Sequence, residues 1–212
     1  MTVIRYILVI LLSYVLGCSN MALYLSKLRG VDMRKGGSGN LGASNAMILM
    51  GWKAGTIVAV HDIGKAVVAV VLAKHFCPGL PLIGAAAGVA CVLGHMFPVF
   101  FGLRGGKGIL SGGVLVLLLD WRVALIAWGL FVSLWLLTRY VSLGSVAATA
   151  SMPVSVFFLL GHNWLYTVLS AAIAALVIWC HRGNIQRLLS GTEKKFHWHV
   201  DAPAGGEDGP QA

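Results

Sequence analysis

Three short stretches of the sequence carry residues that could bind or transfer a phosphate-bearing group. The most compact is Arg104-Gly105-Gly106-Lys107-Gly108, called here the 104–108 segment. Its glycines let backbone N–H groups approach a ligand closely, and its two cations add fixed positive charge. A helix beginning at Ile109 would point its N-terminus at the same place, which favours an anion. The segment therefore predicts a phosphate site, although an ordinary cytoplasmic loop of a membrane protein is also rich in cations.

His95 lies twelve residues before Lys107, near the end of a long apolar run. A titratable side chain beside a cationic loop is a candidate for acid–base chemistry. The alternative is a buried histidine with a purely structural role. We therefore treat His95 as a candidate catalytic residue that belongs to the same site as the 104–108 segment.

The second stretch, the 36–45 segment, reads Gly-Gly-Ser-Gly-Asn-Leu-Gly-Ala-Ser-Asn. Its small residues permit tight turns, and Ser38, Asn40 and Asn45 supply neutral hydrogen-bond donors and acceptors. A flexible linker is the alternative, but two asparagines at this spacing directly before an apolar helix are unusual in a linker. We expect this segment to orient a bound substrate.

The third stretch, the 181–193 segment, follows the last apolar run and contains Asn184, Arg187 and Thr192. Its apolar residues suit a short amphipathic turn at the membrane surface with cations beside them. A juxtamembrane cluster that stops membrane insertion is the alternative. Just beyond it, Phe196-His197-Trp198-His199 resembles a metal pair, but such a stretch more often lies at the headgroup layer. We predict neither a metal site nor a cofactor.

The composition is that of an integral membrane protein. Hydrophobic residues make up 58% of the 212 residues and charged residues only 11%, with a mean hydropathy of +0.84. Soluble domains average about 25% charged residues. Apolar runs of roughly 20 residues recur along most of the chain, which excludes a soluble core. The net charge of +9 falls in loops and tail, and no aromatic–basic module for nucleic acid is visible.

The candidate residues must be positioned by membrane helices. We expect an all-α polytopic membrane protein with about seven transmembrane helices in a single domain, residues 1–200, followed by a disordered cytoplasmic tail, residues 201–212. The expected spans are residues 2–25, 46–73, 82–101, 109–119, 123–137, 146–160 and 164–180. The distribution of Lys and Arg puts the N-terminus outside, the C-terminus inside and all three candidate segments on the cytoplasmic face.

Three internal features of these spans are also predicted. The second span is expected to break near residues 51–55, and Pro153 is expected to kink the sixth span. Asp62 and Lys65, three residues apart on one helical face, are expected to form a structural ion pair at membrane depth. The four cysteines are scattered, so neither a disulfide framework nor a zinc site is implied.

Taken together, the segments resemble the PlsY family of bacterial acyl-phosphate:glycerol-3-phosphate acyltransferases. Residues 38–45 resemble the first motif of that family, residues 94–108 the second, and residues 184–193 the third. Asp62 and Lys65 fall where the family usually has Asp-x-x-Lys. One position departs from the pattern: the family usually carries Arg three residues after the final Asn of the first motif, and here that position is Ile48.

The resemblance implies transfer of a fatty acyl group from acyl phosphate to the 1-hydroxyl of sn-glycerol 3-phosphate, on the cytoplasmic face of the bacterial inner membrane. Ser38 and His95 would be catalytic, and either His95 or a substrate phosphate would accept the proton of the hydroxyl. The substrate-binding residues would be Gly37, Gly39, Asn40, Asn45, Arg104, Gly105, Gly106, Lys107, Gly108, Asn184, Arg187 and Thr192.

Two other functions are compatible with parts of the sequence. A lipid or anion transporter would also carry intramembrane charges and glycine-broken helices. Against it, no convincing internal repeat is visible and the polar segments lie on one face rather than at the midplane. A non-catalytic relative that binds phospholipid precursors is suggested by Ile48.

The sequence also predicts the acyl donor. Acyltransferases that use acyl-CoA or acyl-carrier protein commonly carry His followed five residues later by Asp, and none of the seven histidines has Asp at that offset. No carboxylate stands beside His95 in the sequence, and Asp62 is expected to be committed to Lys65. We therefore expect activity with acyl phosphate and none with acyl-CoA or acyl-carrier protein, because the more activated donor needs less help from a base.

Overall fold

The structure, a computed structural model, describes residues 2–196 of the 212. Over that range it is helical and contains no β-strand, as predicted. The helices are α1 (Thr2–Cys18), α2 (Met21–Arg29), α3 (Ala43–Met50), α4 (Trp52–Phe76), α5 (Ile83–Met96), the 3₁₀ helix η1 (Val99–Phe101), α6 (Ile109–Leu119), α7 (Trp121–Thr138), α8 (Val141–Leu159), α9 (Trp164–Cys180) and α10 (Arg182–Leu189). The expected tail, residues 201–212, and His197 to His199 lie outside the described residues.

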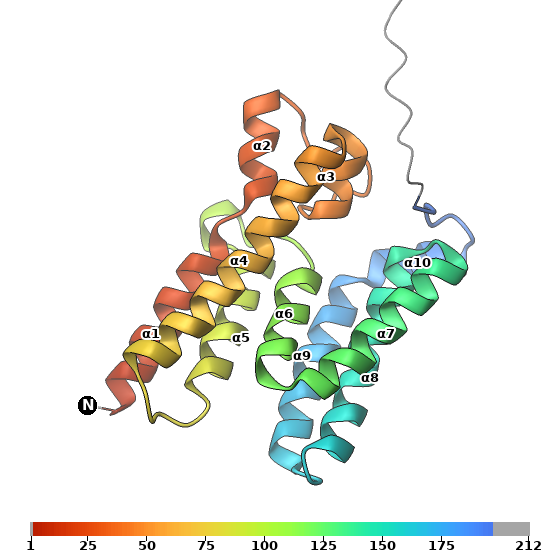
Figure 1. The fold of residues 1–212 in the computed structure, drawn as a ribbon. Helices are drawn as coiled ribbons and strands as arrows, with labels where there is room; N and C mark the ends of the chain where they lie inside the picture. Colours follow the sequence, from red (N-terminus) through yellow and green to blue (C-terminus); the bar gives the residue numbers. More distant parts are fainter. Residues whose placement is uncertain (1, 197–212) are drawn as a thin grey trace, which may run out of the picture.

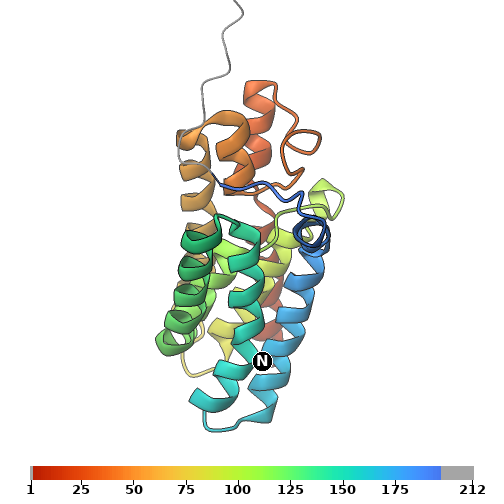
Figure 2. The same cartoon turned by 90° about the vertical axis from the view of Figure 1, so that its right-hand side faces the viewer.

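The long helices form two packed groups on either side of α6 (Figure 1). One group contains α1, α4 and α5, and the other contains α7, α8 and α9. The short helices α2, α3 and α10 lie toward the same end of the bundle (Figures 1 and 2). The three candidate segments border these short helices, so the fold gathers them at one end.

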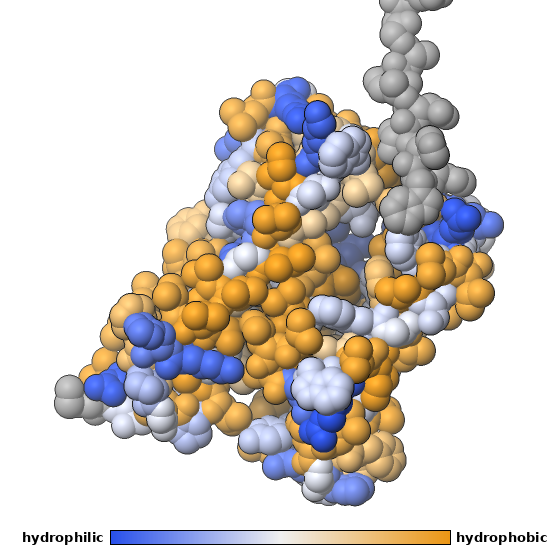
Figure 3. All heavy atoms as spheres, viewed as in Figure 1, coloured by the Kyte–Doolittle hydropathy of each residue, from blue (hydrophilic) through white to orange (hydrophobic). Residues whose placement is uncertain are grey.

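The outer surface of the bundle suits a lipid environment. Figure 3 shows broad apolar sides, with hydrophilic residues concentrated toward the two ends. Large apolar side chains such as Val3, Leu12, Val60 and Leu125 are more than half exposed on α1, α4 and α7. Exposed surface of this extent is expected of helices that face acyl chains rather than water.

Five segments are long and apolar enough to cross a membrane, and a bent pair of helices makes a sixth. The five are Thr2–Arg29, Trp52–Phe76, Ile83–Phe101, Trp121–Thr138 and Val141–Leu159. The pair Trp164–Cys180 and Arg182–Leu189 is bent by 61°, and Ile109–Leu119 is apolar but short. An integral membrane protein with several apolar helices is therefore confirmed, whereas the count of seven spans and the sidedness of the termini stay predictions.

Several helix boundaries differ from the expected ones for local reasons. The first expected span divides at Ser19 and Asn20, because the Asn20 side chain accepts a hydrogen bond from the N–H of Leu23 and caps α2. The break predicted near residues 51–55 is present at Gly51, whose φ of +83° favours glycine. Helix α8 begins at Val141 rather than at residue 146, and within its first turns the Ser145 hydroxyl donates to the Val141 carbonyl at 2.8 Å, which accommodates a polar side chain inside the helix.

Small residues bring α1 and α5 close together. A Cβ atom on Gly17 would collide with the Cys91 carbonyl, and one on Gly94 would collide with the Tyr14 carbonyl. Close backbone contact through small residues is how membrane helices gain van der Waals packing. This contact fixes the C-terminal end of α5, which carries His95.

Candidate active site

A cavity of about 320 Å³ lies where the three candidate segments meet. Six of the predicted site residues line it: Ser38, Gly39, Asn40, Lys107, Asn184 and Arg187. Arg182, which the sequence prediction did not assign, lines it as well. Residues as far apart in the sequence as Ser38 and Arg187, 149 positions, therefore contribute to one cationic hollow, which is the convergence that the span order predicted.

The 36–45 segment is held in shape by Asn45. The side chain of Asn45 is buried, and its Oδ1 accepts a hydrogen bond from the Ser38 N–H at 2.8 Å. Its Nδ2 donates to the Met33 and Asn40 carbonyls, both at 3.0 Å. Asn45 is thus occupied by the loop itself, and this leaves the exposed Ser38 and the partly buried Asn40 to face the cavity.

Two glycines of the same segment need their conformational freedom. Gly37 and Gly39 have φ values of +60° and +70°, a region that residues with a Cβ rarely adopt. A Cβ on Gly37 would also collide with the Asn45 side chain. These glycines shape the turn that presents Ser38.

The 104–108 segment folds back onto the end of α5. The N–H of Gly105 donates to the Met96 carbonyl and that of Gly106 to the His95 carbonyl, both at 3.1 Å. These two amides are already paired, so Lys107 is the member of the segment that faces the cavity. Gly108, with φ of +77°, caps α6. Arg104 is exposed and does not line the cavity.

Gly106 packs directly on His95. A Cβ atom at position 106 would overlap His95 Nε2, so only glycine fits there. Since Gly106 immediately precedes Lys107, His95 lies directly behind the cavity-lining part of the segment.

A hydrogen-bonded network joins Lys107 to the 181–193 segment. Lys107 Nζ donates to Asn184 Oδ1, and Asn184 Nδ2 donates to Glu193 Oε1 at 2.6 Å. Glu193 also accepts from Ser142 Oγ at 2.6 Å and from Arg187 Nε at 2.7 Å. Glu193 therefore fixes which way the Asn184 amide points. Sequence reasoning assigned no role to Glu193 or Ser142, although Glu193 is the one carboxylate in a basic segment.

Burial and pairing shift the pKa values of two groups in this network. Burial lowers the pKa of Lys107 to about 8, with the nearby Glu193 opposing the shift and Arg187 adding to it. Burial alone would raise the pKa of Glu193, but hydrogen bonds from Ser142, Asn184 and Arg187 lower it below its usual value. Thr192 lies apart from the network: it is exposed, and its hydroxyl contacts that of Ser190 at 2.9 Å.

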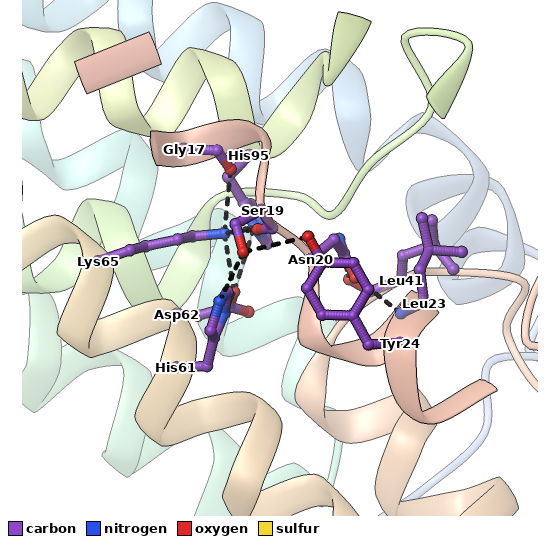
Figure 4. Close-up of polar contacts among 10 residues, drawn as sticks. All are labelled: Gly17, Ser19, Asn20, Leu23, Tyr24, Leu41, His61, Asp62, Lys65 and His95. Carbon is purple, nitrogen blue, oxygen red and sulfur yellow. Dashed lines mark hydrogen bonds and ion pairs between the residues drawn. The ribbon is translucent and has the colours of Figure 1, made fainter. Parts of the chain in front are cut away.

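The predicted Asp62–Lys65 ion pair is present, with Lys65 Nζ 3.0 Å from Asp62 Oδ1. The sequence places no carboxylate beside His95, but the fold brings Asp62 next to it as well. His95 Nδ1 lies 3.3 Å from Asp62 Oδ1 and 2.8 Å from Lys65 Nζ (Figure 4). The contact between Asp62 and His95 could not be predicted from the sequence, because the two residues are 33 positions apart and meet only when α5 packs against α4.

Arg34, which the sequence prediction also did not assign, ties two of the segments together. Its Nη2 donates to the carbonyls of Phe101 at 2.8 Å and Arg104 at 3.2 Å. Arg34 thereby links the 36–45 segment to the 104–108 segment.

Ile48, which stands where the family usually has Arg, is 42% exposed on α3.

Comparison with known proteins places these observations in a family context. Residues 7–191 match the model of a family described as glycerol-3-phosphate acyltransferase. A glycerol-3-phosphate acyltransferase of Myxococcus xanthus is 42% identical over 189 residues, covering 88% of this chain and 97% of the relative. One from Prochlorococcus marinus (strain MIT 9312) is 38% identical over 194 residues, covering 90% and 98%.

Two crystal structures of PlsY, an integral membrane glycerol 3-phosphate acyltransferase, are similar to the whole fold. The glycerol 3-phosphate form superposes with a TM-score of 0.82 at 36% identity, covering 91% of this chain and 96% of that one. The lysophosphatidic acid form superposes with a TM-score of 0.78 at 35% identity, covering 91% and 95%.

Proposed function

This chain belongs to the glycerol-3-phosphate acyltransferase family, and we propose that it transfers a fatty acyl group from acyl phosphate to the 1-hydroxyl of sn-glycerol 3-phosphate. The products are lysophosphatidic acid and phosphate, and the reaction begins phospholipid synthesis. We place the site on the cytoplasmic face of the bacterial inner membrane, as the distribution of Lys and Arg favours.

The observation that supports this proposal most strongly is the composition of the cavity. Lys107, Arg182 and Arg187 supply positive charge, and Ser38 and Asn40 supply neutral polar groups. Both substrates bear phosphate, and one has an apolar tail. A cationic hollow at the end of an apolar bundle suits both, because the phosphate is paired with cations while the tail lies among lipid-facing helices.

Acyl phosphate is a mixed anhydride, so phosphate is a good leaving group and needs little help from the protein. The hydroxyl oxygen attacks the carbonyl carbon, the bond from that carbon to the phosphate oxygen breaks, and phosphate leaves with the bonding electrons. The hydroxyl proton passes to one of two acceptors, His95 or an oxygen of a substrate phosphate. The protein must then position the two substrates and stabilise the charge that develops on the carbonyl oxygen.

The geometry suggests separate roles for the predicted residues. Lys107 and Arg187 bind phosphate, Ser38 and Asn40 orient the acyl phosphate, and Asn184 completes the acceptor site. His95 contacts the reacting hydroxyl from behind Gly106. Asn45 and the two paired glycines, Gly105 and Gly106, act by holding these groups in place. Roles for Arg104 and Thr192 stay predictions, because both side chains are exposed outside the cavity.

The purified protein in lipid nanodiscs, supplied with palmitoyl phosphate with and without glycerol 3-phosphate, tests the proposal. We expect phosphate release that depends on glycerol 3-phosphate and equals the lysophosphatidic acid formed. A transporter would release no phosphate, and a non-catalytic relative would bind both ligands without turnover, so either result would overturn the proposal.

Variants then test the site. Ser38→Ala and His95→Ala are each expected to lower kcat about a hundredfold or more, the usual effect of losing a group that contacts the reacting atoms. Ser170→Ala is the matched control, because Ser170 bonds only the Thr167 carbonyl within α9, ten residues from the cavity end of that helix. Near-wild-type kcat in either test variant would refute that residue's role.

A further inference from the structure

Behind the cavity lies a buried cluster of three ionisable side chains, Asp62, Lys65 and His95. Figure 4 shows the three side chains pointing toward one another. Their exposed fractions are 3%, 4% and 4%. Binding a phosphate at Lys107 requires none of them. Buried charges at membrane depth are costly, and they persist where they are paired and have a use.

The protons of Lys65 can be accounted for individually. Four acceptor atoms surround its Nζ: the Gly17 carbonyl at 3.2 Å, the Ser19 carbonyl at 2.9 Å, Asp62 Oδ1 at 3.0 Å and His95 Nδ1 at 2.8 Å. An ammonium group has three protons and no lone pair. The two carbonyls take one proton each. The third is shared by Asp62 Oδ1 and His95 Nδ1, which are themselves only 3.3 Å apart.

The short contact between Lys65 Nζ and His95 Nδ1 decides the tautomer of the imidazole. Two nitrogen atoms 2.8 Å apart must have one proton between them. Lys65 stays charged, because a neutral amine would leave the buried carboxylate of Asp62 facing only two imidazoles, those of His95 at 3.3 Å and of the partly buried His61 at 3.6 Å, with no permanent cation beside it. The proton therefore belongs to Lys65, and His95 Nδ1 is the acceptor. An imidazolium would instead put two cationic N–H groups in direct contact.

We propose that Lys65, held in place by Asp62, fixes His95 as the neutral tautomer that is protonated on Nε2. Nε2 is the ring nitrogen that faces Gly106, and within the described residues it has no hydrogen-bond partner. His95 then donates a hydrogen bond from Nε2 to a substrate oxygen and does not accept the hydroxyl proton. Lys65 and Asp62 are positioning residues that act through His95. The role toward substrate rests on the function proposed above, whereas the tautomer does not.

Nitrogen-15 NMR of the purified full-length protein, labelled at histidine, tests this directly. The signals of His95 are identified by their loss in His95→Gln. In the wild type we expect Nδ1 to report an unprotonated nitrogen and Nε2 a protonated one. In Lys65→Met we expect Nδ1 to become protonated, with kcat at least tenfold lower and KM within about twofold. Lys53→Met, which alters an exposed lysine of the same helix, should change neither property.

Because Lys65→Met leaves Asp62 as an unpaired buried charge, the variant Asp62→Asn/Lys65→Met removes both charges and serves if the single variant does not fold. A wild-type spectrum with Nδ1 protonated, or an unchanged tautomer in both variants, would overturn the inference. If the spectra are as expected but wild-type protein transfers no acyl group, the tautomer stands and the proposed function fails.

Discussion

Raising the pH from 7 to 9 tests whether the ammonium group of Lys107 binds substrate phosphate. Burial lowers the pKa of Lys107 to about 8, so the group is charged in about nine-tenths of molecules at pH 7 and in about one-tenth at pH 9. The second pKa of a phosphate monoester is about 6, so the charge of glycerol 3-phosphate hardly changes over this range. We therefore expect kcat/KM for glycerol 3-phosphate to fall about tenfold.

The assay is lysophosphatidic acid formation at limiting glycerol 3-phosphate, corrected for spontaneous hydrolysis of the donor at each pH. Lys107→Arg is the matched control, because a guanidinium stays charged throughout this range. Its profile should be flat between pH 7 and 9 even if its activity is lower overall. A flat wild-type profile, or an equal fall in Lys107→Arg, would show that deprotonation of Lys107 does not control binding of glycerol 3-phosphate.

Three further changes test other parts of the structure. Gly106→Ala should lower kcat roughly a hundredfold, because the added methyl group displaces the imidazole of His95. The control Gly112→Ala, which has open space around it in α6, should keep activity and raise the free energy of unfolding by about 0.5–1 kcal/mol. Equal effects of the two variants on kcat would contradict the contact between Gly106 and His95. Arg34→Lys should lower kcat/KM roughly fivefold, which corresponds to about 1 kcal/mol, because it weakens the hydrogen bonds that link two site segments. The control Arg29→Lys loses a similar hydrogen bond, to the Met50 carbonyl at the end of α3, and should leave kcat/KM unchanged. A cysteine at the exposed position Ser190 should resist a membrane-impermeant thiol reagent in spheroplasts and react after permeabilisation, and ready labelling before permeabilisation would contradict a cytoplasmic site.

The parts of the fold that follow from local sequence could be predicted well. Apolar runs marked the long helices, and glycine marked the break at Gly51. Residues 109–119 coincide with α6 because a charged turn and a glycine loop bound them on either side. The division of the first span at Asn20 was missed, since an asparagine within an apolar run signals a helix cap only when its backbone leaves the helix.

Contacts between distant segments could be predicted only in outline. Counting spans brought Ser38, Lys107 and Asn184 to one face, but it gave no means of pairing Asp62 with His95. That pairing depends on the rotation of α4 against α5, which close packing sets and which local patterns do not encode. The hydrogen bonds that the buried Asn45 amide makes within its own loop also could not be predicted from the sequence, and a contact of Asn45 with substrate stays a prediction.

Direct competition between two acyl donors measures which of them the protein uses. Purified protein in nanodiscs receives glycerol 3-phosphate with equal concentrations of palmitoyl phosphate and palmitoyl-CoA, each carrying a different isotope in the acyl chain. The cavity offers cations and small polar groups suited to a phosphate. We predict that essentially all label in lysophosphatidic acid comes from palmitoyl phosphate. Comparable incorporation from palmitoyl-CoA would contradict the donor assignment and the mechanism built on it.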